Sequence, residues 1–167
     1  MTTKKLTQLA MLTGIAFALF VVELQLPGLS PVPGMKLGLA NIITVYALFH
    51  YRPGDVILVV LARILLGALF SGSGMSLLYS MSGSAFCLTG MLLLKNAVGE
   101  QTIWISGIFG AILHNTGQIV MAILVTRTPG VIVYLPLLLV SGVLTGAFTG
   151  LCAQAVIRKL PAAAVDR

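Results

Sequence analysis

Ionisable and amide side chains are few in this sequence, and several of them lie inside or beside long apolar runs. Lys36 and Asn41 belong to a turn rich in glycine and proline that leads directly into an apolar segment. Arg63 lies in the middle of the next apolar run, and His114 lies in the middle of a later one. Such groups cost free energy in a bilayer unless they pair or face a polar cavity, so each is a functional-site candidate. We expect a small molecule to be captured near the turn at Lys36.

The run around His114 has the most informative spacing. Residues four positions apart share one face of a helix, and here that face changes from small residues at one end to polar residues in the middle. The row consists of Ser106, Gly110, His114 and Gln118, with Asn115 on the adjacent row. A single buried histidine is usually a satisfied core residue, but three amide or imidazole groups at bilayer depth favour ligand binding. A purely structural role for the three is the alternative.

Arg63 is expected to point into the protein. An arginine at the centre of a span costs about 2.5 to 3.5 kcal/mol on insertion scales, so it needs Glu23, a ligand or backbone carbonyls as a partner. Glu23 lies near the far end of the first apolar run, where a lone carboxylate needs a cation or water. A structural ion pair is the alternative to ligand binding for Arg63.

Small residues recur at every fourth position in three of the apolar runs, a spacing that lets two helices approach closely. In the first run this row indicates either internal packing or docking to a partner membrane protein; its members are Ala10, Gly14 and Ala18. In the last run packing alone explains the row Gly142, Gly146 and Gly150. In the fourth run the row is polar as well as small, and packing is the alternative to binding; it consists of Ser76, Ser80 and Ser84, beside Tyr79 and Gly83.

The composition requires a membrane environment. Of 167 residues, 58% are hydrophobic and 8% are charged, whereas an ordinary globular domain carries about 25% charged residues. One spanning helix needs roughly 20 apolar residues. The chain therefore predicts a single integral membrane domain, residues 1–167, folded as an all-α bundle of six transmembrane helices. These helices are expected at about residues 6–26, 39–51, 56–70, 75–94, 102–125 and 131–157.

The distribution of basic residues predicts the orientation. With the N-terminus in the cytoplasm, most lysines and arginines fall on the cytoplasmic side, as the positive-inside rule requires; they are Lys4, Lys5, Arg52, Lys95, Arg158, Lys159 and Arg167. Lys36 and Arg127 then lie outside. Both termini are therefore expected in the cytoplasm, with the turn at Lys36 facing outward. The net charge of +6 is dispersed between apolar runs, so we expect a lipid bilayer and not a nucleic acid as partner.

Several kinds of catalytic site are absent from the sequence. It contains no phosphate-binding loop of the G-x-x-x-x-G-K-[ST] type, so the chain does not hydrolyse ATP by itself. It has no aspartate-rich motif to hold magnesium and a diphosphate, and no His, Cys and carboxylate cluster with metal-ligand spacing. Cys87 and Cys152 lie singly in apolar runs. We expect no catalytic residues, no metal and no cofactor, and a protein that is not an enzyme.

Three motifs resemble those of a family of bacterial membrane proteins called Gx transporters, also named heptaprenyl diphosphate synthase component I. They are Pro33-Gly34-Met35-Lys36-Leu37-Gly38-Leu39-Ala40-Asn41, Leu78-Tyr79-Ser80 and Gly110-Ala111-Ile112-Leu113-His114-Asn115-Thr116-Gly117-Gln118. The resemblance covers nearly the whole chain. The family is in turn similar to S components, the substrate-binding subunits of energy-coupling factor (ECF) vitamin transporters. This implies six helices, an outward-open site and no ATPase activity of its own.

The resemblance also implies roles for particular residues. Ala10, Gly14 and Ala18 would dock on the transmembrane coupling protein of the ECF system, which works with a pair of ATPases. Substrate binding would fall to the loop after the first helix and to helices four to six, at Lys36, Asn41, Tyr79, His114, Asn115 and Gln118. The sequence matches no vitamin-specific motif of the better-known S components, so the resemblance does not identify the substrate.

These arguments favour a substrate-binding subunit of an ECF-type transporter in the cytoplasmic membrane of a bacterium. Lys36 and Arg63 give the site a positive bias, which predicts an amphipathic, vitamin-like molecule that is anionic or rich in carbonyl groups. One alternative is a non-catalytic membrane subunit in isoprenoid or quinone metabolism or in extracellular electron transfer. Another is a structural scaffold whose polar groups pair with one another.

Overall fold

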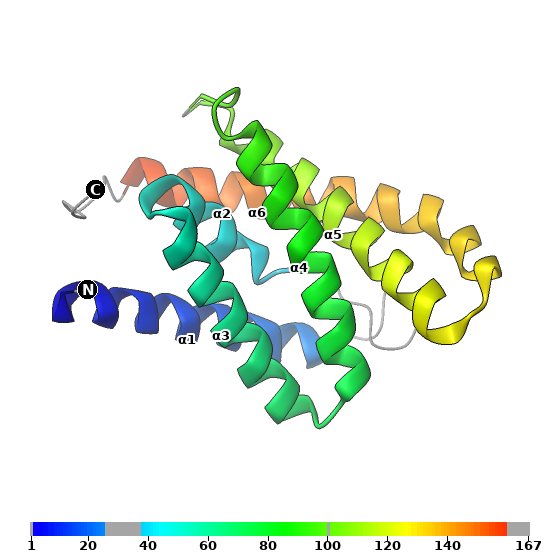
Figure 1. Ribbon diagram of the computed structural model, residues 1–167. Helices are drawn as coiled ribbons and strands as arrows, with labels where there is room; N and C mark the ends of the chain where they lie inside the picture. The colour runs from blue at the N-terminus through cyan, green and yellow to red at the C-terminus, as the bar shows by residue number, and fades with distance from the viewer. Residues whose placement is uncertain (1, 26–37, 100, 160–167) are drawn as a thin grey trace.

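The computed structural model describes residues 2–25, 38–99 and 101–159, and all regular structure in these residues is helical (Figure 1). The helices are α1 (Thr3–Gln25), α2 (Asn41–His50), α3 (Pro53–Ser71), α4 (Gly74–Leu94), α5 (Ile103–Thr126), the 3-10 helix η1 (Pro129–Tyr134) and α6 (Leu135–Lys159). The all-α prediction is confirmed, with helix bounds close to those expected from the apolar runs.

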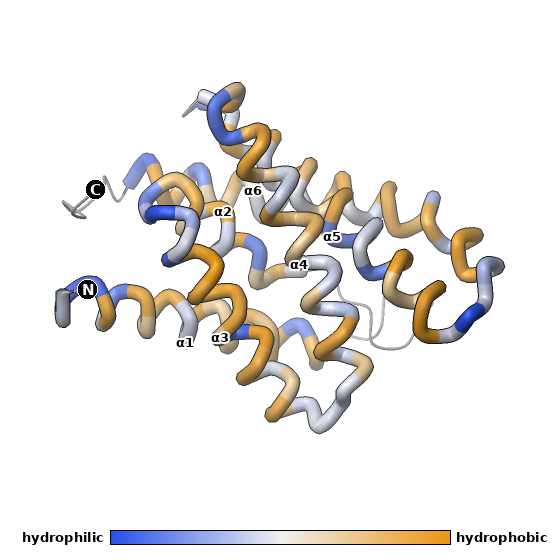
Figure 2. Tube along the Cα trace, viewed as in Figure 1, coloured by the Kyte–Doolittle hydropathy of each residue, from blue (hydrophilic) through white to orange (hydrophobic). Residues whose placement is uncertain are grey.

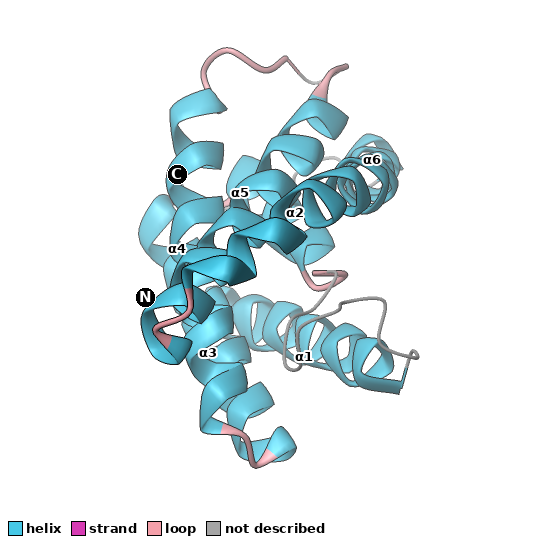
Figure 3. Cartoon of the chain, turned by 90° about the vertical axis from the view of Figure 1, so that its right-hand side faces the viewer, coloured by secondary structure: helices cyan, strands magenta, loops and turns pink. Residues whose placement is uncertain are grey.

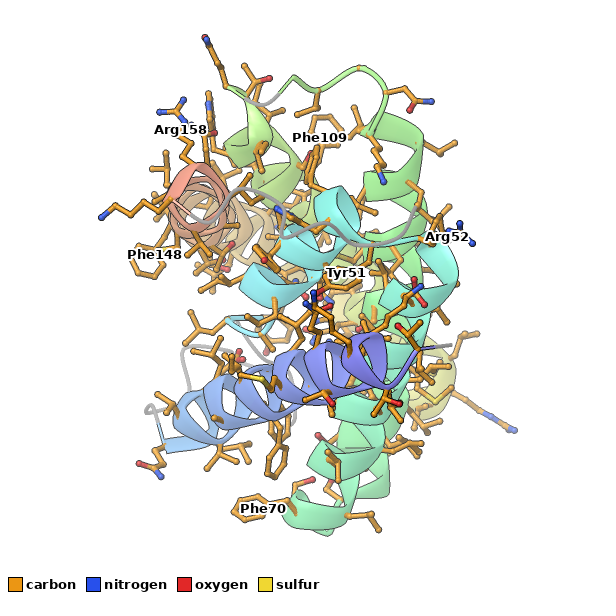
Figure 4. The ribbon with its side chains drawn as sticks, turned by 90° about the vertical axis from the view of Figure 1, so that its left-hand side faces the viewer. Tyr51, Arg52, Phe70, Phe109, Phe148 and Arg158 are labelled. Carbon is orange, nitrogen blue, oxygen red and sulfur yellow. The ribbon has the colours of Figure 1, made fainter. Side chains whose placement is uncertain are left out.

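Five helical segments are long and apolar enough to cross a membrane: α1, α3, α4, α5 and the continuous run from Pro129 to Lys159. Figure 2 shows that hydrophobic residues dominate these helices and that hydrophilic residues occur at helix ends and also within α5. Large apolar side chains face outward, among them Phe70 and Phe148, which project from the surface in Figure 4. An outer surface of this kind is compatible with hydrocarbon and not with water.

Helix α2 differs from the expected span at residues 39–51. It has ten residues and at about 1.5 Å per residue is roughly 15 Å long, which is half of the roughly 30 Å hydrocarbon core. The six-span count is therefore not confirmed. The short run is apolar for another reason: Ile43, Val45, Ala47 and Leu48 are buried. Helix α2 contacts all five other α-helices, and Figure 3 shows it between α1 and α6. It is a central helix of the bundle.

The start of α1 and the end of α6 lie on the same side of the bundle. Lys5 at the start of α1 forms an ion pair with Asp55 at the start of α3, with 2.7 Å between Nζ and Oδ2. Because α1 and α3 begin at the same side, α2 carries the chain back across part of the bundle. Helix α6 ends on the side where α1 begins (Figure 1). This arrangement agrees with termini on one face of the membrane, and the cytoplasmic location of that face stays a prediction.

The two ends of α3 and the start of α4 show how local sequence sets helix ends. Pro53 starts α3, where its missing N–H has no intrahelical partner to lose. Gly72 ends α3 at φ 61°, a left-handed conformation that glycine adopts without steric cost. Ser73 then caps α4, since its Oγ accepts a hydrogen bond from the N–H of Ser76 at 3.3 Å. The chain therefore reverses its direction between Ser71, the last residue of α3, and Gly74, the first residue of α4.

Helices α5 and α6 pack backbone against backbone. A Cβ placed on Gly107 would lie 2.5 Å from the carbonyl oxygen of Gly146, and one on Gly150 would lie 2.6 Å from that of Trp104. Farther along, the side-chain oxygen of Gln154 accepts a hydrogen bond from the N–H of Trp104 at 3.3 Å. The predicted close-packing row on the last helix is confirmed, and α5 is its partner.

This contact predicts opposite effects of one methyl group at two glycines. Gly107→Ala forces α5 and α6 apart and should destabilise the protein by about 1–3 kcal/mol, the usual cost of overpacking. Gly14→Ala is the control, because a Cβ there meets nothing within 4 Å and alanine favours a helix by about 1 kcal/mol over glycine. Thermal unfolding in detergent should give a lower melting temperature for Gly107→Ala only. Equal melting of Gly107→Ala and the wild type would contradict the packing.

Candidate functional site

His114 lies where α4, α5 and the start of α2 meet. It is 3% exposed, and its Nε2 lies 3.0 Å from the side-chain nitrogen of Gln118, one turn further along α5. On one side, a Cβ on Gly83 of α4 would lie 2.9 Å from the His114 ring. On another, a Cβ on Gly38 would lie 3.8 Å from the ring. The absence of side chains at these two glycines leaves room for the imidazole in the bundle interior.

Asn41, the first residue of α2, lies next to the same glycine. Its Nδ2 would be 3.0 Å from a Cβ on Gly38, and the side chain is 3% exposed. Gly38 has φ +85°, a conformation that other L-residues rarely adopt. The structure therefore brings together Asn41, His114 and Gln118, from two helices far apart in the chain, around a glycine required by both its backbone angle and its crowded surroundings.

This region has buried hydrogen-bonding atoms without a protein partner. Among the described residues, Asn41 Nδ2 and Gln118 Oε1 make no hydrogen bond, although Asn41 is 3% and Gln118 0% exposed. Exchanging the two ends of the Gln118 amide would still leave one end free, because only the other end faces His114. Native proteins leave few buried polar atoms unsatisfied, and each calls for water, an ion or a ligand.

Arg63 points inward, as expected, and lies between α1 and α4. It is 6% exposed. Its Nη2 donates a hydrogen bond to Ser84 Oγ at 3.2 Å, and its charge attracts the carboxylate of Glu23. Its Nε, by contrast, makes no hydrogen bond with any described residue. The attraction to Glu23 therefore agrees with a structural ion pair. The Nε without a described partner agrees with ligand binding.

Two further predicted residues lie in different surroundings. Asn115 turns toward α6, where its Nδ2 donates a hydrogen bond to the carbonyl of Leu138 at 2.6 Å. Tyr79 is 2% exposed and belongs to an apolar cluster with Ile119, Ala122 and Leu138. Both residues connect the helices that surround His114, but their visible contacts are with α5 and α6 and not with Asn41.

Other predictions concern the loop and the outer face of α1. Lys36 lies outside the described residues, so its role stays a prediction. Ala10, Gly14 and Ala18 are exposed on α1, whose only helix contacts within the described chain are with α2 and α3. The internal-packing interpretation of this row therefore has no support in the described structure, and docking to a partner stays a prediction.

A separate groove of about 300 Å³ lies between α3 and α4. Its lining is almost entirely apolar and includes none of the residues predicted to bind substrate; it consists of Ile57, Val60, Leu61, Ile64, Met81, Ser84, Ala85, Leu88, Thr89 and Leu92. No group of three His, Cys, Asp or Glu residues that could hold a metal occurs in the described ranges.

Comparison with known sequences places the chain in a family. The sequence profile of the family described as heptaprenyl diphosphate synthase component I matches residues 12–156. The chain belongs to this family. The matched region runs from the third turn of α1 to near the end of α6, and it contains every described residue of the candidate site.

A solved structure shows the same fold. It is the S component of a bacterial ECF transporter, with a TM-score of 0.72 and 21% sequence identity, over 93% of this chain and 94% of that one. No curated protein sequence matches this member of the component I family. The predicted resemblance to this family and to the S-component fold is confirmed.

Glu23 has contacts that the sequence did not predict. Its carboxylate accepts hydrogen bonds from the backbone N–H groups of Gly38 and Leu39, in addition to its attraction to Arg63. The available signal was a lone carboxylate near the end of an apolar run. Sequence reasoning assigned it a cation or water and did not consider backbone donors.

The buried charges give a testable stability difference. Arg63→Met removes a buried positive charge that attracts the carboxylate of Glu23, which is 7% exposed, and removing one member of a buried pair of opposite charges costs about 3–5 kcal/mol. Arg52→Met is the control, because Arg52 is exposed and points away from the protein (Figure 4). Thermal unfolding in detergent should show a large loss for Arg63→Met and almost none for Arg52→Met. Similar melting of the two variants would show that Arg63 has no compensating role.

Proposed function

We propose that this protein is the substrate-binding membrane subunit, or S component, of an ECF-type transporter. One observation carries the proposal: Asn41 and Gln118 present free hydrogen-bonding atoms around His114 while being 3% and 0% exposed. Free polar groups at this depth are costly unless something binds them. The fold shared with the S component of a bacterial ECF transporter supports the same conclusion.

The substrate proposed for this site is a small, vitamin-like amphipathic molecule. The free groups of Asn41 and Gln118 suit a ligand rich in carbonyl or amide groups. Arg63 and, from the sequence, Lys36 add positive charge that would favour an anionic group. Tyr79, assigned to the site by the family resemblance, would contact a nonpolar part of the ligand.

Transport by this subunit would depend on partners, and the subunit itself would not be an enzyme. The chain has no nucleotide-binding loop, so ATP hydrolysis would come from a pair of ATPases joined to it by a transmembrane coupling protein. The exposed row Ala10, Gly14 and Ala18 offers a face on which another helix can approach closely. The assembly would lie in the cytoplasmic membrane of a bacterium, with both termini of this subunit inside.

The family description favours a second candidate. A protein described as a component of heptaprenyl diphosphate synthase could instead be a non-catalytic membrane subunit in isoprenoid or quinone metabolism, or in extracellular electron transfer. Isolation from native membranes separates the two proposals. A coupling protein with two ATPases would support transport, and a soluble prenyltransferase would support the second candidate.

Ligand retention tests the binding site. Native mass spectrometry of the detergent-purified protein should show a bound small molecule. We expect His114→Ala and Gln118→Ala each to reduce its occupancy by about tenfold or more, since a buried hydrogen bond to a ligand is worth about 1–3 kcal/mol. Lys36→Ala is predicted from the sequence to act in the same direction.

Thr116→Ala provides the matched control. Thr116 lies on the same helix, but its hydroxyl donates to the carbonyl of Ile112 at 2.8 Å and so is occupied within α5. Equal occupancy in His114→Ala, Gln118→Ala and Thr116→Ala would remove the site assignment.

Replacing a small residue of α1 with a large one tests the proposed docking face. Gly14→Leu places a large side chain where nothing lies within 4 Å, so the isolated subunit should fold normally. Close approach of a partner helix should be blocked, and co-purification with a co-expressed coupling protein and its ATPases should fall to background. Met11→Leu, on an exposed position of the same helix, should leave the complex intact. A stable complex of Gly14→Leu would place the docking surface elsewhere.

A further inference from the structure

Glu23 joins the far end of α1 to the chain just before α2. Its two carboxylate oxygens accept hydrogen bonds from the N–H of Gly38 at 2.5 Å and from the N–H of Leu39 at 3.2 Å. The side chain is 7% exposed. These bonds connect residues separated by 15 and 16 positions in the sequence. A bond between a carboxylate and a backbone N–H is among the stronger hydrogen bonds in proteins.

The two residues held by Glu23 are rigidly connected to α2. The carbonyl of Gly38 accepts a hydrogen bond from the N–H of Asn41 at 2.9 Å, and that of Leu39 accepts one from the N–H of Ile42 at 3.1 Å. The carboxylate therefore lies at the N-terminal end of α2, where the helix dipole favours negative charge. A displacement of Gly38 and Leu39 would be passed to the first turn of α2.

The first turn of α2 belongs to the candidate binding site. Gly38 lies against both the Asn41 side chain and the His114 ring. Asn41 supplies one of the free hydrogen-bonding atoms of the site. The contacts thus form a continuous path from Glu23 on α1, through Gly38, to Asn41 and His114.

We infer that Glu23 is a positioning residue, which fixes Gly38 and Leu39 to α1 and thereby holds Asn41 beside His114. The placement of α1 then sets the geometry of the binding site. Helix α1 also carries the exposed row of Ala10, Gly14 and Ala18, so a partner that moves α1 would also move Asn41. The role of Glu23 in substrate binding rests on the proposed function. The connection of Glu23 to Gly38 and Leu39 does not.

A different role for Glu23 is that it only compensates the charge of Arg63. The two roles separate in a background without that charge. In Arg63→Met, the variants Glu23→Gln and Glu23→Leu are both neutral at these two positions and similar in size. Glutamine retains one oxygen, which can accept from Gly38 or from Leu39, and leucine retains none. Any difference between the two double variants therefore reports the hydrogen bonds and not the charge.

Amide hydrogen exchange measured by mass spectrometry on the full chain in detergent tests the inference. At the amides of Gly38, Leu39 and the first turn of α2, exchange should be about tenfold or more faster in Glu23→Leu/Arg63→Met than in Glu23→Gln/Arg63→Met. Tenfold corresponds to the free energy of about one hydrogen bond. Exchange in α5 and α6 should be the same in both, because a positioning role is local. Gln25→Leu, at an exposed position on the same end of α1, should match the wild type.

Equal exchange at Gly38 and Leu39 in the two double variants would overturn the inference, and so would faster exchange spread evenly over all helices. Neither result bears on the proposed function, which depends on ligand occupancy in the His114 and Gln118 variants. Conversely, a protein that binds no small molecule but shows the local exchange difference would lose the proposed function and keep the connection through Glu23.

Discussion

The hydrogen bonds from Gly38 and Leu39 to Glu23 are the interaction on which the centre of this protein depends. In a bilayer no water is available to satisfy backbone groups, so a chain that leaves a regular helix at membrane depth must satisfy them within the protein. Here α2 is too short to span the hydrocarbon core, and the residues before it require other acceptors. The carboxylate of Glu23 provides them. The positive charge of Arg63 attracts this carboxylate, which lowers the cost of burying it, and Arg63 in turn donates a hydrogen bond to Ser84.

The six α-helices divide into parts with different constraints. Helices α5 and α6 meet through glycines with no room for a methyl group between them, so their relative position is tightly restricted. Helix α1 contacts α3 and α2 within the described chain and leaves its row of small residues uncovered. His114 and Gln118 therefore lie on α5, whose position is restricted by α6. Asn41 lies on the short helix α2, whose first turn is fixed to α1. If α1 moves, Asn41 moves with the first turn of α2, while His114 and Gln118 keep their place on α5. The geometry of the proposed site therefore changes when only α1 moves.

Sequence reasoning succeeded where membrane physics acts on long segments and missed features that depend on tertiary contacts. The long helices, the inward direction of Arg63 and the polar face of α5 at His114 follow from the cost of exposing polar groups to hydrocarbon. The role of α2 does not, because an apolar run of this length suits a short span and a buried core helix equally. Nor does the partner of Glu23, since backbone N–H groups have no signature in the sequence.

Gly38 was noted as part of a turn, but its contacts with Asn41 and His114 arise only when α5 packs against α2. Asn115 was grouped with His114 by helix spacing and Tyr79 by the family resemblance, and the structure shows that Asn115 faces α6 and that Tyr79 belongs to an apolar cluster.

The charges around the site constrain what it can bind. Of the two positive residues that predicted an anionic ligand, Arg63 is already attracted by the carboxylate of Glu23, so part of its charge is compensated within the protein. The free atoms next to His114 belong to the amides of Asn41 and Gln118, which are neutral and pair best with carbonyl and N–H groups. In the proposed site, a net preference for anions would therefore have to come from Lys36, whereas recognition beside His114 would select hydrogen-bonding pattern over charge. In a low-dielectric interior this division is favourable, because a neutral amide loses much less solvation free energy on burial than a carboxylate does. A ligand with an apolar body and a carbonyl-rich end beside His114 would satisfy these requirements of the proposed site, and Lys36 is predicted from the sequence to favour any negative charge that it carries.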